Sequence, residues 1–274
     1  MSRVGDERGA GAVSLLTLAV LLSTLLGLPV AVLVARAIIQ GSLQVALSSD
    51  AVLQALALSL GTTAVSLVVT IAIGLPLAVV LARRQFRGSW LVEAVIDLPI
   101  VLPPSVAGLA LLLVFGRRGL LGEPLSLLGV EIAFTTIAVI VAQVFVSAPF
   151  FIRSARAGLA AVDGDLEDAA RVDGASEVRV LWLISMPLAG GALAAGLVMS
   201  WARALGEFGA TIMFAGNIEG VTQTLPLVVY SEFQGGDLDA SVAAAAILIL
   251  AALGVLVAVR VLRWGRALDV RASA

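Results

Sequence analysis

The sequence contains no cysteine, no histidine and no lysine. The first two absences exclude thiolate chemistry and Cys-ligated metal sites, and they remove the commonest metal ligand and the usual near-neutral general base. All 17 basic residues are therefore Arg. Because the P-loop that cradles nucleotide phosphates needs its Lys, this chain is not by itself a standard P-loop ATPase. Any ATP-driven role would depend on an ATPase in another subunit.

Charged residues are scarce as well, at 13% of the 274 residues, whereas hydrophobic residues make up 60%. The mean hydropathy is +1.09. Soluble domains are usually about 45–50% apolar and about 25% charged, so this composition indicates an integral membrane protein. We expect an all-α fold that forms one transmembrane domain over residues 1–274. The net charge of −2 indicates no preference for a charged partner, and we expect no binding to nucleic acid.

Long apolar segments predict about six transmembrane helices, since a helix needs about 20 apolar residues to cross a hydrocarbon core about 30 Å thick. The apolar stretch in the first segment is longer than that of a secretory signal, which is usually about 7–15 residues, so we interpret it as a retained span. The predicted spans cover residues 12–35, 55–82, 95–116, 132–153, 188–216 and 240–260.

The arginines are distributed unevenly between the two sides of these spans. With the amino end inside, thirteen of the 17 Arg residues lie in segments that would be cytoplasmic. Only Arg36, Arg117 and Arg118 lie in outer segments, and Arg203 lies within a span. The positive-inside rule then predicts a multi-pass protein of the cell membrane with both termini in the cytoplasm. The polar segment between the fourth and fifth spans would face the cytoplasm too.

That polar segment, residues 158–187, carries five acidic side chains within residues 163–173. Most of them crowd the start of a predicted helix, where carboxylates interact favourably with the helix dipole. Gly174 is placed to end this helix in a left-handed turn, and Ser176 can cap a second one. We therefore expect two short helices around a glycine at the membrane surface. An ordinary solvated loop is the plainer interpretation, since runs of charge are usually solvated.

The spacing within the segment resembles the EAA motif of ABC importer permeases, which is Glu-Ala-Ala, three residues, Gly, nine residues, Ile, one residue, Leu-Pro. There are two departures from the motif. Asp168 stands in place of Glu, directly after Glu167, and Met186 stands in place of Leu. Either carboxylate could contact a partner. The positions that we assign to this coupling segment are Glu167, Asp168, Ala169, Ala170, Gly174, Ile184 and Pro187.

The resemblance implies a type I ABC importer permease fold, in which this segment forms a coupling helix that docks on a separate ATPase subunit. It further implies a homodimer that works with two ATPase subunits and an extracytoplasmic binding protein. ATP and Mg²⁺ would then bind to the ATPase, and this chain would hold no cofactor, no metal and no catalytic residue. The chain would be a transport subunit and not an enzyme.

Further stretches resemble the molybdate permeases in particular, and together they cover the chain from about residue 55 to 260. They comprise residues 98–108, 115–122, 203–211 and 215–226. The sulfate permeases share the Ala-Leu-Gly-Glu-Phe-Gly core that begins at Ala204, whereas the Phe-Gly-Arg-Arg-Gly and Gly-Asn-Ile pieces favour molybdate. The resemblance therefore implies a molybdate importer, with sulfate or tungstate as alternative substrates.

Several residues within or beside the spans are candidates for the transport path or for helix packing. Arg203 and Glu207 are four residues apart and can pair on one helical face. They would be either a fixed charge near the path of a dianion or a neutralised pair that locks helix packing. The second interpretation is favoured because an unscreened Glu would repel an oxyanion. The other candidates are Gly206 for close helix contact, Pro103 and Pro104 for a helix break, and Asp97 as a cap of the third span.

Two functions of other classes compete with the importer. An ion-gradient-driven secondary transporter would need no ATPase, but the spaced Gly and Pro of the polar segment would then be accidental. A membrane enzyme or redox scaffold is the weakest alternative, because a chain without His or Cys offers no haem or metal constellation to assign.

Overall fold

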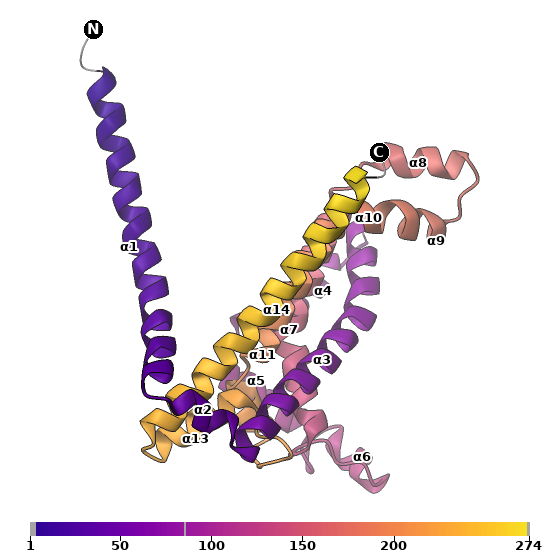
Figure 1. Cartoon of the computed structure of the whole chain (residues 1–274). Helices are drawn as coiled ribbons and strands as arrows, with labels where there is room; N and C mark the ends of the chain where they lie inside the picture. The colour runs from indigo at the N-terminus through magenta and orange to yellow at the C-terminus, as the bar shows by residue number, and fades with distance from the viewer. Residues whose placement is uncertain (1–3, 85, 273–274) are drawn as a thin grey trace.

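The computed structural model describes residues 4–84 and 86–272, and every regular element in these residues is a helix (Figure 1). The long helices are α1 (Val4–Ile39), α3 (Asp50–Arg83), α7 (Thr136–Ala160) and α14 (Leu238–Ala272). The helices of intermediate length are α4 (Ser89–Val101), α5 (Pro104–Phe115), α8 (Gly164–Val172), α11 (Gly190–Leu205) and α13 (Leu225–Gln234). The shorter elements are α2 (Ser42–Leu47), α6 (Gly122–Leu127), α9 (Glu177–Val180), η1 (Leu181–Ser185), α10 (Met186–Leu188) and α12 (Gly209–Phe214).

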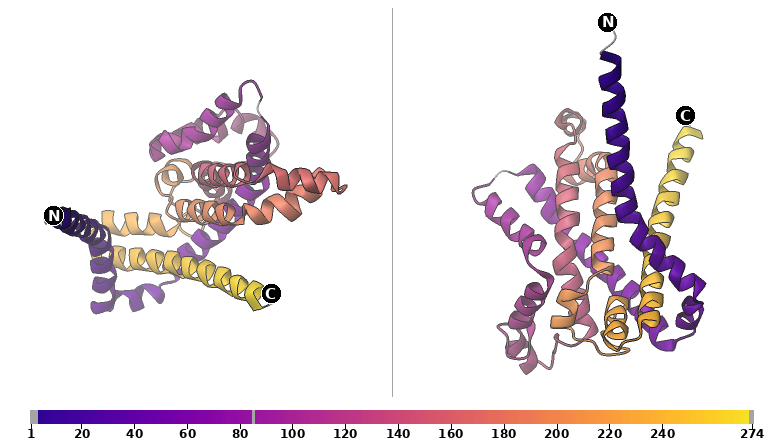
Figure 2. Two further views of the ribbon diagram at one scale, coloured as in Figure 1. Left: turned by 90° about the horizontal axis from the view of Figure 1, so that it is seen from above. Right: turned by 90° about the vertical axis from the view of Figure 1, so that its left-hand side faces the viewer.

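The long helices run between two ends of the molecule. The described start of α1 and the described end of α14 lie at the same end as α8 and α9, whereas α2, α6 and α13 lie at the opposite end (Figure 1). Helix α1 stands away from the other long helices along most of its length, as both Figure 1 and Figure 2 show. An ion pair of 3.1 Å between Arg36 and Asp239 joins the C-terminal end of α1 to the start of α14.

Within the described residues, four helices are long and apolar enough to cross a membrane, and the number rises to six if each of two bent helix pairs forms one span. Helices α4 and α5 are bent by 118°, and the helix that ends at Leu188 meets α11 at 73°. The predicted span 95–116 is therefore divided into two helices by the first bend, which corrects its interpretation as one helix. The second bend lies at the start of the predicted span 188–216, which contains α11 and the separate short helix α12. At the bend between α4 and α5, the Leu102 backbone is extended, as expected for a residue that precedes a proline. Pro103 also lacks a backbone N–H group to donate to a helical hydrogen bond.

The core lies where α3, α7 and α11 pack together, and it is built largely from small residues. Ala78, Ala155 and Ala189 are buried there beside Phe151. Helix α3 also carries a series of buried hydroxyl side chains along its length. Thr62 Oγ1 donates to the Leu58 carbonyl at 2.8 Å, and such bonding within the protein satisfies polar groups that lipid could not. The series consists of Ser59, Thr62, Thr63, Ser66 and Thr70.

A packed helix lies at the end of the bundle opposite α8 (Figure 1). Residues 217–239 contain α13, whose Leu225, Leu227 and Val228 are buried. The Leu225 amide donates to Ser59 Oγ at 2.8 Å and so fixes the start of α13 against α3. This segment is a packed part of the bundle at the end away from α8.

Candidate functional site

The polar segment forms a helical hairpin that projects from one end of the bundle (Figure 1). Asp163 caps α8 by accepting a hydrogen bond from the Asp165 amide at 3.0 Å. The chain turns at Gly174, whose φ of 86° lies in the left-handed region that glycine adopts most readily, and returns along α9. The predicted pair of short helices around a glycine is thus confirmed. Ser176 is the N-cap residue of α9, but its hydroxyl makes no capping bond.

Glu167 ties this hairpin to the end of α3. Its Oε1 accepts a hydrogen bond of 2.6 Å from Arg83 Nη2 and one of 2.5 Å from Ser185 Oγ. Arg83 Nη2 also donates to Ser185 Oγ at 2.6 Å, which closes a triangle between α3, α8 and η1. The Glu167 side chain is only 13% exposed. Because the pair is shielded from water, its mutual attraction is screened less than that of a surface pair.

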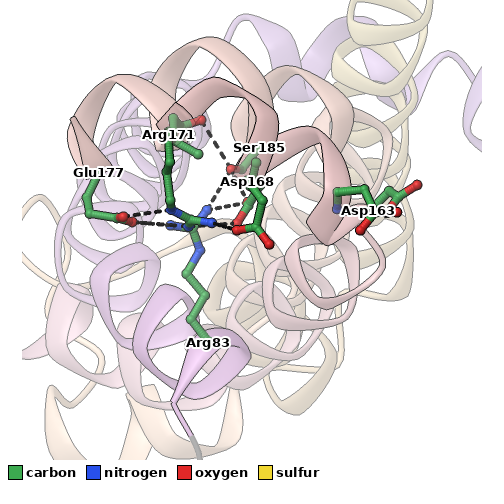
Figure 3. A network of polar contacts seen from close by, with 9 residues as sticks. Arg83, Asp163, Asp168, Arg171, Glu177 and Ser185 are labelled. Atoms are coloured by element: carbon green, nitrogen blue, oxygen red, sulfur yellow. Dashed lines mark hydrogen bonds and ion pairs between the residues drawn. The ribbon is translucent and has the colours of Figure 1, made fainter. Parts of the chain in front are cut away.

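Arg171 holds the two arms of the hairpin together (Figure 3). Its guanidinium contacts Glu177 at 2.7 Å and Asp168 at 2.6 Å, and it reaches Glu167 at 3.3 Å. The hydrogen bonds to Glu177 and then Asp168 raise the pKa of Arg171. The hydrogen bond from Arg171 lowers the pKa of the Glu177 carboxyl below its ordinary value of 4.5. The hairpin is therefore held together by charge.

The two neighbouring carboxylates that the sequence left undistinguished have different positions. Glu167 points inward to Arg83 and Ser185, whereas the Asp168 side chain is 74% exposed. Asp163 points away from the contacts around Arg171 (Figure 3). Asp168 is thus the carboxylate of this adjacent pair that lies open to a partner. The Arg83 contact was missed from the sequence because the two residues are 84 positions apart.

The outer surface of the hairpin is apolar as well as charged. Helix α8 has no buried residue, and the Leu166 and Val172 side chains on it are 49% and 88% exposed. Val178 on α9 is 65% exposed. Of the other residues assigned to the coupling segment, Ala169, Gly174 and Pro187 are exposed, and Ala170 and Ile184 are half-buried. Exposed apolar side chains rimmed by charge are typical of a surface that binds another protein.

A cleft of about 650 Å³ lies between the hairpin and the end of α3. Its walls carry Arg83, Arg84 and Arg171 opposite Glu167 and Glu177, together with apolar side chains of α3 and α7. The residues that the structure describes contain no group of three or more acidic side chains that could hold a metal ion. The exposed apolar side chains and the paired charges of this site suit contact with another protein.

The second group of candidate residues lies where α11 gives way to α12. Arg203 Nη1 and Glu207 Oε2 form an ion pair 2.5 Å apart. The Glu207 side chain is 1% exposed, and its Oε1 accepts a hydrogen bond of 2.7 Å from the Ala210 amide at the start of α12. Gly206 is the residue that ends α11. This geometry favours the helix-packing interpretation of the pair.

Pro103 and Pro104 stand at the break between α4 and α5, directly beside α12. A Cβ added to Gly209 would lie 2.6 Å from Pro104 Cβ, so the two backbones approach as closely as glycine allows. Asp97 does not cap a helix as predicted, because it lies within α4 and forms an ion pair with Arg153 of α7.

A bundle of long apolar helices, with bent helix pairs and a charged hairpin projecting from one end, defines the class of the protein, which is a multi-pass membrane protein. The chain belongs to the family described as binding-protein-dependent transport system inner membrane component, whose profile matches residues 74–266. It is accordingly a transport subunit and not an enzyme. This membership also favours the ABC importer over the ion-gradient-driven transporter.

Relatives described as transport system permease proteins support the same class. The chain is 43% identical over 198 residues to the molybdenum transport system permease protein ModB of Mycobacterium tuberculosis, covering 72% of this chain and 75% of the relative. It is 41% identical over 181 residues to the putative molybdenum transport system permease protein YvgM of Bacillus subtilis, covering 66% and 80%. A third relative, the probable transport system permease protein NifC of Clostridium pasteurianum, is 41% identical over 172 residues, covering 63% of this chain and 60% of the relative.

The fold is that of a type I ABC importer permease. The structure matches a chain in the crystal structure of a bacterial ABC transporter involved in the import of the acidic polysaccharide alginate, with a TM-score of 0.75. The match covers 93% of this chain and 96% of the other at 17% sequence identity. The same transporter in complex with an alginate pentasaccharide-bound periplasmic protein gives a TM-score of 0.74. At this identity the match establishes the fold alone.

Proposed function

We propose that this chain is the membrane subunit of an ATP-driven molybdate importer and that the α8–α9 hairpin docks on a separate ATPase subunit. One observation carries the docking proposal. The segment with EAA-like spacing is an exposed, partly apolar hairpin that is fastened to the bundle through Glu167 and Arg83. A movement imposed on the hairpin would therefore reach the long helices.

The proposed assembly contains two copies of this chain, two ATPase subunits and an extracytoplasmic molybdate-binding protein. ATP and Mg²⁺ bind to the ATPase subunits in this assembly, and the permease itself holds no cofactor. The hairpin and both termini face the cytoplasm, a placement supported by the excess of Arg in those segments. The described start of α1 and the described end of α14 lie at the same end as the hairpin, which agrees with that orientation (Figure 1).

In the proposed mechanism the two carboxylates have separate tasks. Asp168 contacts the ATPase from the exposed side of α8, and Glu167 transfers displacement of α8 to α3 through Arg83. The chain itself connects the hairpin to α7 and α11. Closure of the ATPase dimer would thus favour one packing of these helices over another, and transport would follow from the shift between inward-open and outward-open states.

Molybdate is the favoured substrate because relatives described as molybdenum transport system permease proteins match at 38–43% identity over 181–198 residues. Sulfate is the second candidate, since the probable sulfate transport system permease protein cysT of Chlorokybus atmophyticus is 37% identical over 153 residues. Tungstate shares the charge and shape of molybdate and stays an alternative.

The test is uptake of radiolabelled molybdate into liposomes that contain the chain with its ATPase and binding protein. We expect uptake that requires ATP and is blocked by excess tungstate but not by sulfate. Liposomes without the binding protein, and liposomes with an ATPase whose P-loop Lys is replaced, serve as controls. Competition by sulfate at equal concentration would reassign the substrate. Uptake that is indifferent to ATP would overturn the coupling role of the hairpin.

A further inference from the structure

Helix α4 is attached to the bundle by two ion pairs and by Ile96, which packs against the core cluster around Phe151 and Ile152. It has no buried residue, and its outward face carries Trp90, Val95 and Val101 at 71%, 57% and 80% exposure. On its inward face Asp97 meets Arg153 of α7 through two nitrogen–oxygen contacts of 2.8 Å each. Glu93 lies one turn earlier on α4 and meets Arg156 at 2.7 Å. We call these four residues the α4–α7 clamp.

The clamp is not a close-packed contact. A pocket of about 50 Å³ is lined by all four of its residues and by Leu81, Ile96 and Ile152. The side chains of Asp97 and Glu93 are 32% and 34% exposed, so both pairs are partly shielded from solvent. A small cavity therefore remains beside the paired charges at the contact between α4 and α7.

Helix α5 is attached in the opposite way. Its Gly108 approaches α12 so closely that a Cβ would lie 2.6 Å from the Ala210 carbonyl oxygen. Ala107 and Leu111 are buried in one cluster with Ala138, Val146 and Phe214. Helix α5 is thus locked by shape to α12 and to the first half of α7, whereas the clamp attaches α4 to the second half of α7.

A proline lies between the α4 attachment and the α5 attachment on each side of the contact, one within α7 and one between α4 and α5. Pro149 lies within α7 between Val146, which contacts the α5 cluster, and Arg153 of the clamp. A proline in a helix removes one backbone hydrogen bond and allows the helix to bend at that point. The break between α4 and α5 lies at Pro103. A bend of α7 at Pro149 would therefore move α4 relative to α5 and be absorbed at Pro103.

We propose that Glu93, Asp97, Arg153 and Arg156 are positioning residues that make α4 follow the second half of α7 when the hairpin is displaced. The clamp lies within about two turns of the end of α7 at Ala160, and α7 leads directly into α8. Displacement of α8 thus reaches the bent α4–α5 pair by a route that does not pass through Arg83. This inference rests on the proposed function, because it assumes that a partner displaces the hairpin.

The first test is charge reversal in the reconstituted complex, with uptake per ATP hydrolysed as the measurement. We expect Asp97→Arg or Arg153→Asp alone to lower this ratio about tenfold, a typical size for coupling between sites. The double variant Asp97→Arg/Arg153→Asp should recover to within about threefold of the wild type, and Glu93 and Arg156 should behave in the same way. Asp239→Arg, which breaks the exposed pair with Arg36, is the matched control and should leave the ratio unchanged.

A second measurement does not depend on transport or on correct insertion of a charge-reversed variant. Because the chain has no Cys, introduced cysteines at the exposed positions Ala94 and Ala157 would be its only thiols. Spin labels there report the α4–α7 distance, and labels at Ala94 and Leu113 report the α4–α5 distance. In the complex with its ATPase, trapping with ATP and vanadate should leave the first distance unchanged and shift the second.

The outcomes separate the two proposals. The clamp would be overturned, with the proposed function intact, if a single charge reversal left uptake per ATP hydrolysed at the wild-type value. It would also be overturned if a double reversal restored this ratio no further than the single reversals. A change in the α4–α7 distance on trapping, or a constant α4–α5 distance, would overturn it as well. Absence of ATP-dependent uptake by the wild type would instead refute the proposed function, and the spin-label distances would still decide whether α4 follows α7.

Discussion

The hairpin and the α5–α12 contact are held by different forces, and two glycines show the difference. In the hairpin nothing lies within 4 Å of a Cβ built on Gly174, but its φ of 86° disfavours any L side chain. In the α5–α12 contact the Gly108 backbone is ordinary, but a Cβ would lie 2.6 Å from the Ala210 carbonyl oxygen. Gly174 is needed for the conformation of the chain, whereas Gly108 is needed for space.

The difference extends to the neighbouring side chains. Around Gly174 the contacts are ion pairs of exposed or half-exposed groups such as Arg171 and Glu177. Gly108 instead packs against the backbone of the buried Ala210, and the buried carboxylate of Glu207 accepts a hydrogen bond from the same residue's amide. A contact made of paired charges can be displaced without opening a cavity, whereas a close-packed contact cannot be displaced cheaply. Substitutions at the two places should therefore affect different properties.

The largest effect on stability is expected from Gly108→Ala. The added methyl group would overlap backbone atoms of α12, and overpacking of this kind costs about 1–3 kcal/mol in the free energy of unfolding. The measurement is denaturant or thermal unfolding of the purified chain in detergent. The matched control is Gly61→Ala within α3, where a Cβ meets nothing within 4 Å. Gly61→Ala should be neutral or stabilising by about 0.5–1 kcal/mol, and equal effects at both sites would remove the distinction.

Gly174→Asp should change stability less and function more. A non-glycine residue in the left-handed region costs about 1 kcal/mol, and Asp tolerates that region better than most. The variant should still insert into the membrane, but the hairpin would no longer present α8 correctly and coupled ATP hydrolysis should be abolished. Gly164→Ala, at an open position without positive φ, is the control. Normal coupled hydrolysis in Gly174→Asp would contradict docking through the hairpin.

The smallest effect is expected from Glu177→Gln, and it should depend on pH. The bond from Arg171 lowers the pKa of Glu177 in the folded chain below 4.5, so its contribution to stability is present above pH 4.5 and is lost as the pH falls through the lowered pKa. The unfolding midpoints of wild type and Glu177→Gln should differ slightly at pH 7 and converge well below pH 4.5. If the difference between the two unfolding midpoints grew as the pH fell, the stabilising contribution assigned to ionised Glu177 would be wrong.

The sequence predicted the helical class, the hairpin and the proximity of Arg203 to Glu207, because each depends on hydropathy or on short spacing along the chain. It did not predict how Glu167 and Asp168 divide between inside and outside. That division depends on Arg83 and Ser185, which approach Glu167 only when α3, α8 and η1 come together. Local patterns carry no information about such a contact.

The bends were also only partly predictable. Pro103 and Pro104 indicated a break, yet the 118° bend depends on where α4 and α5 find partners, and Asp97 finds Arg153 at a separation of 56 positions. The break after α10 has no proline at the bend itself, since Pro187 lies within α10 and the chain turns at Ala189. Hydropathy continues smoothly through the first bend, and the predicted fifth span began at Leu188, so hydropathy did not indicate either change of direction.

The π-helix η1 at Leu181–Ser185 joins α9 to α10. A π-turn closes its hydrogen bonds over one residue more than an α-turn, so this stretch carries one residue more than regular α-geometry would need. Each residue of an α-helix advances the chain by about 100° around the axis. Loss of a single residue here would therefore rotate α9, with α8, by roughly that angle relative to α10. The direction in which a permease presents its hairpin can thus be reset by chain length alone, with every charged side chain conserved.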